Sequence, residues 1–302
     1  MKGQKRITVV GSLNMDLVVS MQRMPRIGET VNGHEMHIIP GGKGANQAVG
    51  CAKLGAQVLL IGAVGKDSFG DELLIKLETT GICTDSIVRL DDYSTGTATI
   101  FHTPQDNCIV VVAGANGQCT PELVVHCEAK IREADVLLVQ LEIPLDSVQT
   151  ALRIARSAGV ITVLNPAPAV RLPKEILDLT DVLTPNETEF ELLSGASYGS
   201  DVELQQGMLR WEQNGPRVIV TRGEKGASLI KDGVLHTVPT RSVHVVDTTG
   251  AGDAFNAALC FSLAGGGDIL DAVDTAVKAA SISVTRLGAQ AGMPTMEEVS
   301  RL

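Results

Sequence analysis

Short apolar runs alternate with segments of helical periodicity along most of this 302-residue chain. Each run is bounded by turn residues and is shorter than a typical helix, which predicts buried strands. The predicted strands are 7–10, 58–64, 136–140, 160–164, 182–184 and 218–221, and two late helices are predicted at 253–264 and 268–285. Repeated strand–helix–strand units place a parallel sheet between two layers of helices. The predicted fold class is therefore α/β, with a doubly wound, mostly parallel sheet.

Three segments have a different pattern. Residues 17–40, 86–90 and 97–112 are strand-like, with breaks at Pro25 and Gly33 and no helical period. We expect these pieces to pair in a small separate sheet that covers one end of the main sheet as a lid. The expected division is an α/β nucleotide- and substrate-binding domain at 1–14, 41–91 and 114–302, and a β lid at roughly 15–40 and 92–113.

Composition limits the possible partners. The net charge is −10 and aromatic residues make up 3% of the chain, so neither a basic surface nor base-stacking platforms for nucleic acid are expected. The same negative charge argues against an anionic membrane as partner. An acidic protein can still bind phosphate compounds, but it needs local amides, a few cations or a metal ion to do so.

The cysteines and the N-terminus indicate a cytoplasmic protein. The six cysteines show no C-x-x-C pair and no metal-ligand spacing, and several lie among apolar residues. This is typical of buried thiols in a reducing compartment. The first apolar run, 7–10, is too short for a signal peptide, and no run reaches the roughly 18 residues of a membrane span.

The segment 243–255 combines an apolar run, a glycine turn and a helix start. Val243 to Val246 resembles a buried strand, and Gly250-Ala251-Gly252 precedes a helix that begins near Asp253. Unpaired amides and the positive dipole end make such a helix start an anion site. Asp253 is then either a base that takes a proton from a hydroxyl group attacking a phosphoryl group, or a residue that merely caps the helix or complements its dipole. The segment alone leaves both open.

A second glycine-rich segment, 41–46, offers different chemistry. Its three glycines allow close approach of a ligand, Lys43 supplies a cation and Asn46 a two-way hydrogen-bonding amide. The spacing is not that of a Walker A loop. Together with Asn14 and Asp16, which follow the first predicted strand, these groups suit a polyhydroxylated ligand such as a sugar. The alternative is a glycine-rich turn with a solvated lysine.

These motifs carry a resemblance to a known family. Asn14-x-Asp16, the Gly-Gly-Lys-Gly-Ala-Asn run at 41–46 and the Asp-Thr-Thr-Gly-Ala-Gly-Asp run at 247–253 together resemble the ribokinase family of carbohydrate kinases. The similarity continues at 140–142, 165–168, 184–189, 221–223 and 284–289, so it covers essentially the whole chain. Both glycine runs in this order form a specific signal.

The resemblance implies ATP-dependent phosphorylation of the 5-hydroxyl of ribose. It makes Asp253 the catalytic base and the amides of Gly250, Ala251 and Gly252 the anion hole. The positions implied to grip the sugar are Asn14, Asp16, Gly42, Lys43, Asn46, Glu142 and Asp253. The positions implied on the nucleotide side are Asn186, Glu189, Thr221, Gly223, Gly226 and Gly252, with Asn186 and Glu189 near the phosphates and Mg²⁺.

The resemblance also implies a K⁺ site beside the anion hole and a homodimer that forms through the lids. The implied K⁺ ligands are the side chain of Asp247 and the carbonyl groups of Thr249, Ser283, Arg286, Gly288 and Gly292. Among these ligands, only Asp247 can be recognised from its residue type. The alternative for Asp247 is an aspartate that forms a turn at the end of the strand. Gly292 departs from the family, which often has serine before this proline region.

Two other readings compete with a ribose kinase. A sibling kinase could act on deoxyribose, a ketohexose or a nucleoside, and Met15, Thr97 and Ile109 are the positions where differences are expected. A catalytically silent sugar- or nucleotide-binding regulator could share the fold, although a silent protein has no need of Asp253. A Rossmann dehydrogenase is disfavoured because no G-x-G-x-x-G follows the first strand.

Overall fold

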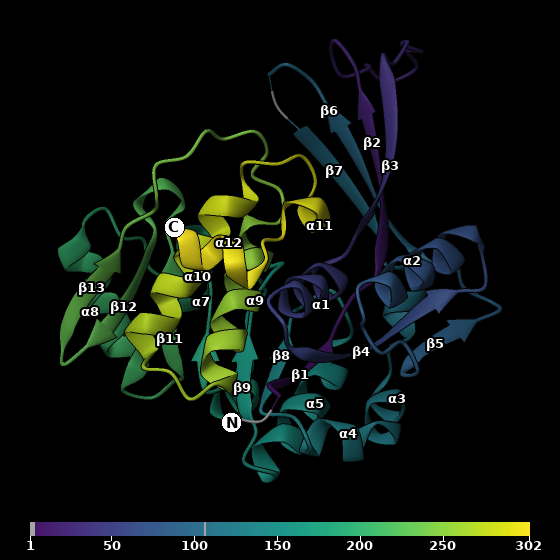
Figure 1. The fold of residues 1–302 in the computed structure, drawn as a ribbon. Helices are drawn as coiled ribbons and strands as arrows, with labels where there is room; N and C mark the ends of the chain where they lie inside the picture. Colours follow the sequence, from purple (N-terminus) through teal and green to yellow (C-terminus); the bar gives the residue numbers. More distant parts are fainter. Residues whose placement is uncertain (1–3, 106) are drawn as a thin grey trace.

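A computed structural model of the chain describes residues 4–105 and 107–302 (Figure 1). Residues 1–3 and 106, which belong to the expected domain ranges, lie outside the described residues. The larger sheet has nine strands in the order β13-β12-β11-β10-β9-β8-β1-β4-β5. They are β1 (Arg6–Val10), β4 (Gln57–Gly65), β5 (Ile87–Leu90), β8 (Val136–Val139), β9 (Ile161–Leu164), β10 (Val182–Leu183), β11 (Arg217–Thr221), β12 (Ala227–Lys231) and β13 (Val234–Val238).

The strand order confirms the doubly wound sheet. From β1 the chain adds β4 and β5 on one side and β8 to β11 on the other, all in parallel. Within the described residues, β12 alone runs against the other strands of this sheet, since it pairs antiparallel with β11 and with β13 at one edge. The point where the strand order reverses, around β1, is where open α/β sheets usually bind ligands.

Helices cover both faces of this sheet. They are α1 (Lys43–Lys53), α2 (Ser68–Thr79), α3 (Pro121–His126), α4 (Glu128–Arg132), α5 (Leu145–Ser157), α6 (Lys174–Asp178), α7 (Glu187–Ser194), α8 (Asp201–Glu212), α9 (Ala251–Ala264), α10 (Ile269–Ser283), α11 (Ala289–Gly292) and α12 (Met296–Arg301). Val9 packs into the core with α1, α9 and α10, whereas its neighbour Val10 packs on the other face with α5. Because successive side chains point to opposite faces, a strand buried on both faces must be apolar throughout.

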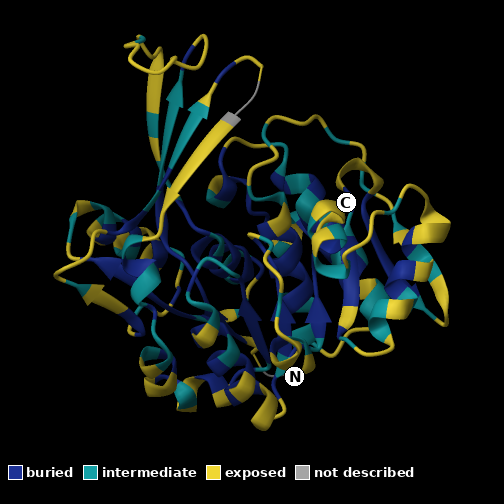
Figure 2. Cartoon of the chain, turned by 180° about the vertical axis from the view of Figure 1, so that it is seen from behind, coloured by how far each residue is buried: buried dark blue, intermediate teal, exposed yellow. Residues whose placement is uncertain are grey.

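A second sheet of four strands forms the lid, in the order β3-β2-β6-β7. Its strands are β2 (Asn14–Ser20), β3 (Glu35–Gly41), β6 (Gly96–His102) and β7 (Asn107–Val112). The lid projects from the α/β body, and its strands are largely yellow and teal where the central strands of the large sheet are dark blue (Figures 1 and 2). The predicted separate sheet is therefore confirmed.

One strand assigned to the lid from its pattern was placed wrongly. Residues 86–90 contain β5, which pairs in parallel with β4 at the edge of the large sheet. Ile87 is buried in the main hydrophobic core. Burial of Ile87 attaches the strand to the large sheet. The residue pattern alone does not indicate which of the two sheets buries this side chain.

The expected buried strand at 243–246 was also wrong. This segment has no regular structure, and Val245 and Val246 are each 54% exposed. The segment is not part of the large sheet, whose strand order ends at β13. Instead, the amides of Val246 and Asp247 both donate to the carbonyl oxygen of Val284, at 2.7 and 3.2 Å, which ties the segment to the end of α10.

The cysteines agree with the prediction only in part. Cys51, Cys119, Cys127 and Cys260 are buried, but Cys83 and Cys108 are exposed, and all six are free thiols. Within the described part of the chain, the helices are too short or too polar to span a bilayer.

Candidate active site

The predicted site residues gather at the carboxyl ends of the central strands. Gln140, Asn165 and Thr184 directly follow the last residues of β8, β9 and β10, and Ser12 follows β1. Helices α1 and α9 meet there, because Asn46 and Gln47 of α1 bond to Asp253 of α9. Segments more than 200 residues apart in sequence thus form one cluster.

Asp253 is a buried carboxylate at the start of α9. It is 7% exposed and accepts one hydrogen bond on each oxygen, from Asn46 Nδ2 and Gln47 Nε2, both at 3.0 Å. It does not cap the helix, whose N-cap is Gly250 without a side-chain cap bond. Burial raises the pKa of Asp253, while Lys43 and the two amide hydrogen bonds lower it. The structure therefore excludes the cap. Asp253 still lies in the first turn of α9, where a carboxylate also complements the helix dipole, and its role as a base stays a prediction.

Asp16 and Glu142 place two further carboxyl groups near Asp253. Burial, followed by the charges of Glu142 and Asp253, raises the pKa of Asp16 to about 7, against the opposing effect of Lys43. A Cβ atom at Gly41 would lie 2.1 Å from Asp16 Oδ2, so the glycine makes room for this carboxyl group. Such a set of acceptors around one lysine suits a ligand that presents several hydroxyl groups.

Two residues that the sequence analysis missed hold this cluster in place. Ser12 donates to Glu142 Oε2 at 2.5 Å, and the Lys43 amide donates to the same oxygen at 3.1 Å. Asn116, in the 3₁₀ turn η1 (Gly114–Gln118), donates to Asn14 Oδ1 at 2.7 Å and to the Leu13 carbonyl at 3.1 Å. Ser12 could have been found from its place directly beyond β1. Asn116 carries no local sequence signal.

The glycine turn before α9 takes the form expected of an anion site. Gly250 adopts φ +79°, a left-handed conformation, and Gly42 at the start of α1 does the same at φ +85°. The amides of Gly252 and Asp253 lie in the first turn of α9, where the helix itself supplies no acceptor. The Ala251 amide, however, already donates to the Thr248 carbonyl at 3.2 Å.

Asp247 ties two loops together beside this turn. Its Oδ1 accepts from the Thr249 amide at 2.9 Å and its Oδ2 from the Gly288 amide at 2.8 Å. Burial alone would raise its pKa, but these hydrogen bonds outweigh burial and lower it. The Ser283 and Gly292 backbones approach closely, since a Cβ atom at Gly292 would lie 2.7 Å from the Ser283 carbonyl oxygen. The predicted cation-ligand positions therefore lie in adjoining segments: the loop at 247–249, the end of α10 and the segment 286–292.

On the nucleotide side, Asn186 and Glu189 form a capping box at the start of α7. Asn186 Oδ1 accepts from the Glu189 amide, and Glu189 Oε2 accepts from the Asn186 amide, both at 2.8 Å. Burial raises the pKa of Glu189, and the nearby charge of Lys43 opposes this shift. Thr221 lies beside Asn186 across a parallel bridge, so the end of β11 and the start of α7 are held together.

The loop between Thr221 and Gly226 turns sharply. Gly223 and Gly226 both adopt positive φ angles, and a Cβ atom at Gly226 would lie 1.9 Å from the Val238 carbonyl oxygen. The structure thus brings Asn186, Glu189, Thr221, Gly223 and Gly226 into one region, separate from the sugar-side cluster around Asp253.

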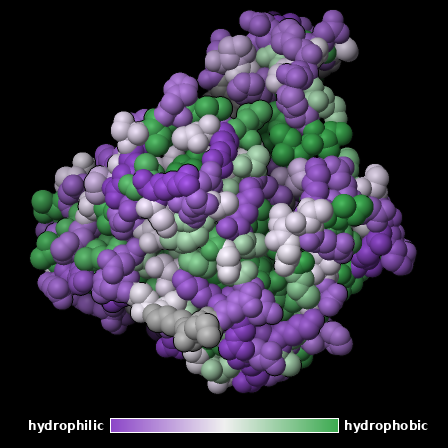
Figure 3. All heavy atoms as spheres, in the orientation of Figure 1, coloured by the Kyte–Doolittle hydropathy of each residue, from purple (hydrophilic) through white to green (hydrophobic). Residues whose placement is uncertain are grey.

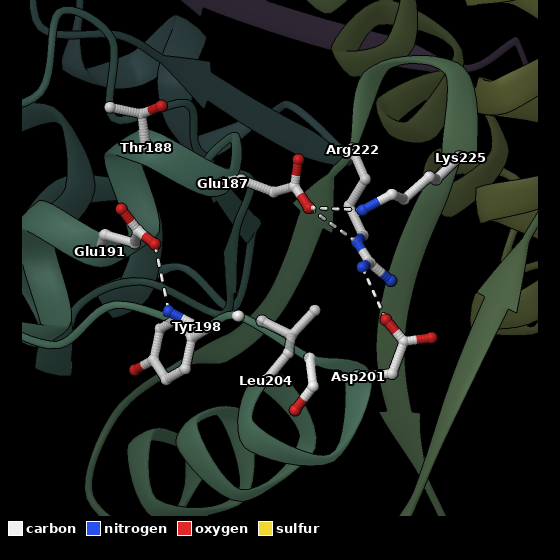
Figure 4. Close-up of a pocket in the computed structure, with 10 residues that line it drawn as sticks. Glu187, Thr188, Glu191, Tyr198, Asp201, Leu204, Arg222 and Lys225 are labelled. Carbon is white, nitrogen blue, oxygen red and sulfur yellow. Dashed lines mark hydrogen bonds and ion pairs between the residues drawn. The ribbon is translucent and has the colours of Figure 1, made fainter.

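Arg222 holds this loop in place through its buried side chain. The sequence analysis did not identify this residue. Its side chain is 5% exposed and points away from the loop into a pocket of about 280 Å³ (Figure 4). There it bonds to Glu187 at 3.1 Å, at the start of α7, and to Asp201 at 2.7 Å, at the start of α8. A charged residue in a glycine-rich loop is usually solvated, so the sequence alone does not indicate that Arg222 is buried.

The strand register of the lid decides which lid residues face the cluster. Asp16, Ile39, Ala98 and Val111 are cross-strand partners on one face, and Ile109 lies two residues along on that same face. Met15 and Thr97 are paired on the opposite face, and Met15 is fully buried. Of the three positions expected to differ between sibling kinases, only Ile109 shares the face of Asp16.

A doubly wound sheet with a separate lid, and a buried carboxylate where a glycine turn starts a helix, define an α/β phosphotransferase of small molecules. The family model of the pfkB family carbohydrate kinases matches residues 4–296, and the chain belongs to that family.

Individual relatives agree with this family. The chain is 40% identical to the ribokinase of Bacillus subtilis over 99% of both proteins, and 36% identical to a deoxyribokinase of Salmonella typhi over 97% of this chain and 96% of that protein. Among solved structures, Arabidopsis thaliana ribokinase complexed with ribose and ATP superposes with a TM-score of 0.93 at 32% identity, covering 99% of this chain and 98% of that one.

The raised pKa of Asp16 predicts a pH-dependent effect on stability. With its pKa moved from 3.8 to about 7, the folded protein binds more protons at this carboxyl than the unfolded chain does in that pH window. The free energy of unfolding therefore loses up to about 4 kcal/mol as the pH rises through the window. Asp16→Asn removes this titration, so the variant gains stability relative to the parent protein between pH 4 and pH 7.

Urea unfolding of both proteins across this pH range measures the difference. Asp85→Asn, at an exposed aspartate away from the cluster, is the matched control and should track the parent protein. A constant difference between Asp16→Asn and the parent protein at every pH would contradict the prediction.

Proposed function

We propose that this protein transfers the γ-phosphoryl group of ATP to the 5-hydroxyl of D-ribose, giving D-ribose 5-phosphate and ADP. The observation that carries the proposal is the placement of Asp253. Its carboxylate is buried, is held on both oxygens by side-chain amides, and lies at the start of a helix that a glycine turn opens. A base and an anion site are thereby adjacent, which phosphoryl transfer to a hydroxyl group requires.

The sugar side is proposed to consist of Asn14, Asp16, Gly42, Lys43, Asn46 and Glu142. Carboxylate and amide oxygens accept hydrogen bonds from the sugar hydroxyls, which relieves the mutual repulsion of Asp16, Glu142 and Asp253. Asp253 removes the proton of the 5-hydroxyl as its oxygen attacks the γ-phosphorus. The amides of Gly250 to Gly252 then stabilise the charge that develops on the transferred group.

The nucleotide side is proposed to consist of Asn186, Glu189, Thr221, Gly223, Gly226 and Gly252. The glycine backbones let ATP approach the loop closely, and Arg222 fixes the loop from the far side. Mg²⁺ prefers oxygen ligands, which Asn186 and Glu189 offer, and when bound it would neutralise phosphate charge. No cluster of three or more potential metal ligands occurs in the described ranges 4–105 and 107–302, so the phosphates of ATP would supply most of the coordination.

The lid, proposed to span residues 15–40 and 92–113, closes over the bound sugar. Because Asp16 lies on β2, the lid contributes directly to the sugar side. Closure excludes water, so that the phosphoryl group reaches the sugar and is not hydrolysed.

Deoxyribose is the second candidate substrate, since a deoxyribokinase is 36% identical to this chain. An assay of ADP release from Mg-ATP in K⁺ buffer, with ribose, 2-deoxyribose, fructose and adenosine, separates the candidates. We expect the highest kcat/KM with ribose. Preference for another acceptor would reassign the substrate, and sugar binding without turnover of any acceptor would favour the silent regulator.

In the same assay, Asp253→Asn should lower kcat by about 10²- to 10⁴-fold, because it removes general base catalysis. The amide keeps the size of the carboxyl group, so ribose binding measured by calorimetry should change little. Full activity of the variant would remove Asp253 from the mechanism.

A K⁺ site is proposed in the two loops that Asp247 joins. Its ligands would be the Asp247 side chain and the carbonyl groups of Thr249, Ser283, Arg286, Gly288 and Gly292. The lowered pKa of Asp247 keeps it charged, and it lies next to the Thr248–Gly252 turn. A bound cation would therefore support the geometry of the anion hole.

Replacing K⁺ by Na⁺ at constant ionic strength should lower kcat several-fold, because the smaller ion fits a carbonyl cage built for K⁺ less well. Asp247→Ala should abolish this difference between the two ions. Equal rates of the parent protein in both salts would rule out a functional K⁺ site.

Association through the lids is proposed because their outer face is apolar. Met36, Ile38, Val110 and Val112 lie on the face opposite Asp16 and are each 46% to 56% exposed. Figure 3 shows green, apolar atoms on the lid where it joins the body. Packing two such faces together would bury them and protect the strand edges.

A location in the cytoplasm stays a prediction.

Sedimentation at micromolar concentration tests this association. The parent protein should sediment as a dimer, and Val110→Lys should sediment as a monomer because it buries a charge in the contact. Val234→Lys changes an equally exposed valine on β13 and should leave the dimer intact. A monomeric parent protein would contradict the proposed association.

A further inference from the structure

Gln47 contacts the Asp253 carboxylate from within the protein interior, where it is inaccessible to a substrate. It is 0% exposed and lies on α1, one turn after Lys43. Its Nε2 atom donates to Asp253 Oδ1 at 3.0 Å and to Asn165 Oδ1 at 3.1 Å. Its Oε1 atom accepts from Gln140 Nε2 at 2.5 Å. Both hydrogens and the oxygen of the amide therefore have partners, and the side chain has one orientation.

The orientation of Gln47 is set by residues at the ends of three neighbouring strands. Gln140 follows β8 and donates to Gln47, so the NH₂ group of Gln47 must face Asp253. Asn165 follows β9 and donates to the Thr184 carbonyl at 3.2 Å, which turns the Asn165 oxygen toward Gln47. The large sheet thereby determines the direction from which Asp253 receives its hydrogen bond.

The same network returns to the first turn of α9. The hydroxyl of Thr184, which follows β10, donates to Asn256 Oδ1 at 2.6 Å, and Asn256 Nδ2 donates to the Gly252 carbonyl at 2.8 Å. The Asp253 side chain and the peptide preceding it are thus both connected to the same strand ends. Gly11 accommodates this arrangement, because a Cβ atom there would lie 2.0 Å from Gln140 Oε1.

We propose that Gln47 is a positioning residue that aims the Asp253 carboxylate at the acceptor hydroxyl and favours its ionised form, with Gln140 fixing which end of the Gln47 amide faces Asp253. The inference rests on the proposed function of Asp253 as the base. A buried carboxylate that loses a hydrogen-bond donor becomes easier to protonate, and it also loses its fixed direction.

Three charged groups around Asp253 also affect its titration. Lys43 on α1 favours the carboxylate, whereas Glu142 beyond β8 and Asp16 on β2 disfavour it. The kcat–pH profile at saturating ribose and ATP reports the enzyme–substrate complex, in which Asp16 and Glu142 are engaged by the sugar. The acidic limb of that profile is therefore the measurement that isolates Asp253.

Gln47→Leu removes the donor and keeps a similar volume. We expect the acidic limb of kcat to move up by about one to two pH units, so that kcat at pH values below the limb falls about 10- to 100-fold, with KM for ribose and for ATP within about 3-fold of the parent values. Gln47→Glu should move the limb at least as far, because it places a second carboxylate beside Asp253.

Gln140→Glu tests the orientation with Gln47 intact. A carboxylate at position 140 cannot donate, so the Gln47 amide turns to donate to it and presents its oxygen to Asp253. The acidic limb should therefore shift as in Gln47→Leu. This variant also serves if Gln47→Leu does not fold, which thermal unfolding of each protein will show.

Thr162→Val is the matched control for loss of a buried polar group. Thr162 is 0% exposed on β9, where its hydroxyl bonds to the Leu179 carbonyl at 2.8 Å, away from Asp253. Its pH profile should match that of the parent protein even if its stability falls.

An acidic limb that stays in place in the Gln47 and Gln140 variants would overturn the inference. Failure of the parent protein to phosphorylate any acceptor would instead overturn the proposed function, and an active Asp253→Asn would remove Asp253 from the mechanism, so these failures can be told apart.

Discussion

The contact between α1 and α9 is the constraint on which the site depends. Asn46 and Gln47 are neighbours on α1, and each donates to a different oxygen of Asp253 at the start of α9. This pair of bonds holds a charge that burial disfavours. It also fixes the separation of the two glycine turns, at Gly42 and Gly250, that open the helices. The proposed sugar side and anion site could share a single hydroxyl group because these helices are held in register.

Around that contact, three carboxyl groups of like charge lie close together. Asp16, Glu142 and Asp253 act on one another electrostatically, with Lys43 as the nearby cation. Ser12, Asn116 and the Lys43 amide hold these acidic and polar groups in place. The cluster is tolerated because backbone and side-chain donors surround it, and it becomes favourable when a polyhydroxylated ligand supplies further donors.

Much of the fold could be predicted because the buried strands are almost entirely apolar and the turns carry glycine or a capping residue. Residues 7–10 and 136–139 are examples, with β1 and β8 at the expected places. The errors have physical causes. Residues 86–90 join the large sheet through burial of Ile87, and residues 243–246 resemble a strand but are held by hydrogen bonds to the end of α10. Gln47 directly follows the recognised motif at 41–46, yet only the three-dimensional contacts show that it faces Asp253. Asn116 and Arg222 act through partners distant in sequence, which no local pattern contains.

The position of Asp16 on β2 has a thermodynamic consequence. The strand that carries this sugar-side carboxyl group also runs through the middle of the lid, between β3 and β6. If the lids associate as proposed, sugar binding and subunit association act on the same strand and are linked. Any free energy that an ordered lid adds to sugar binding must then appear equally in subunit association. The apparent affinity for the sugar would consequently depend on the concentration of the protein itself.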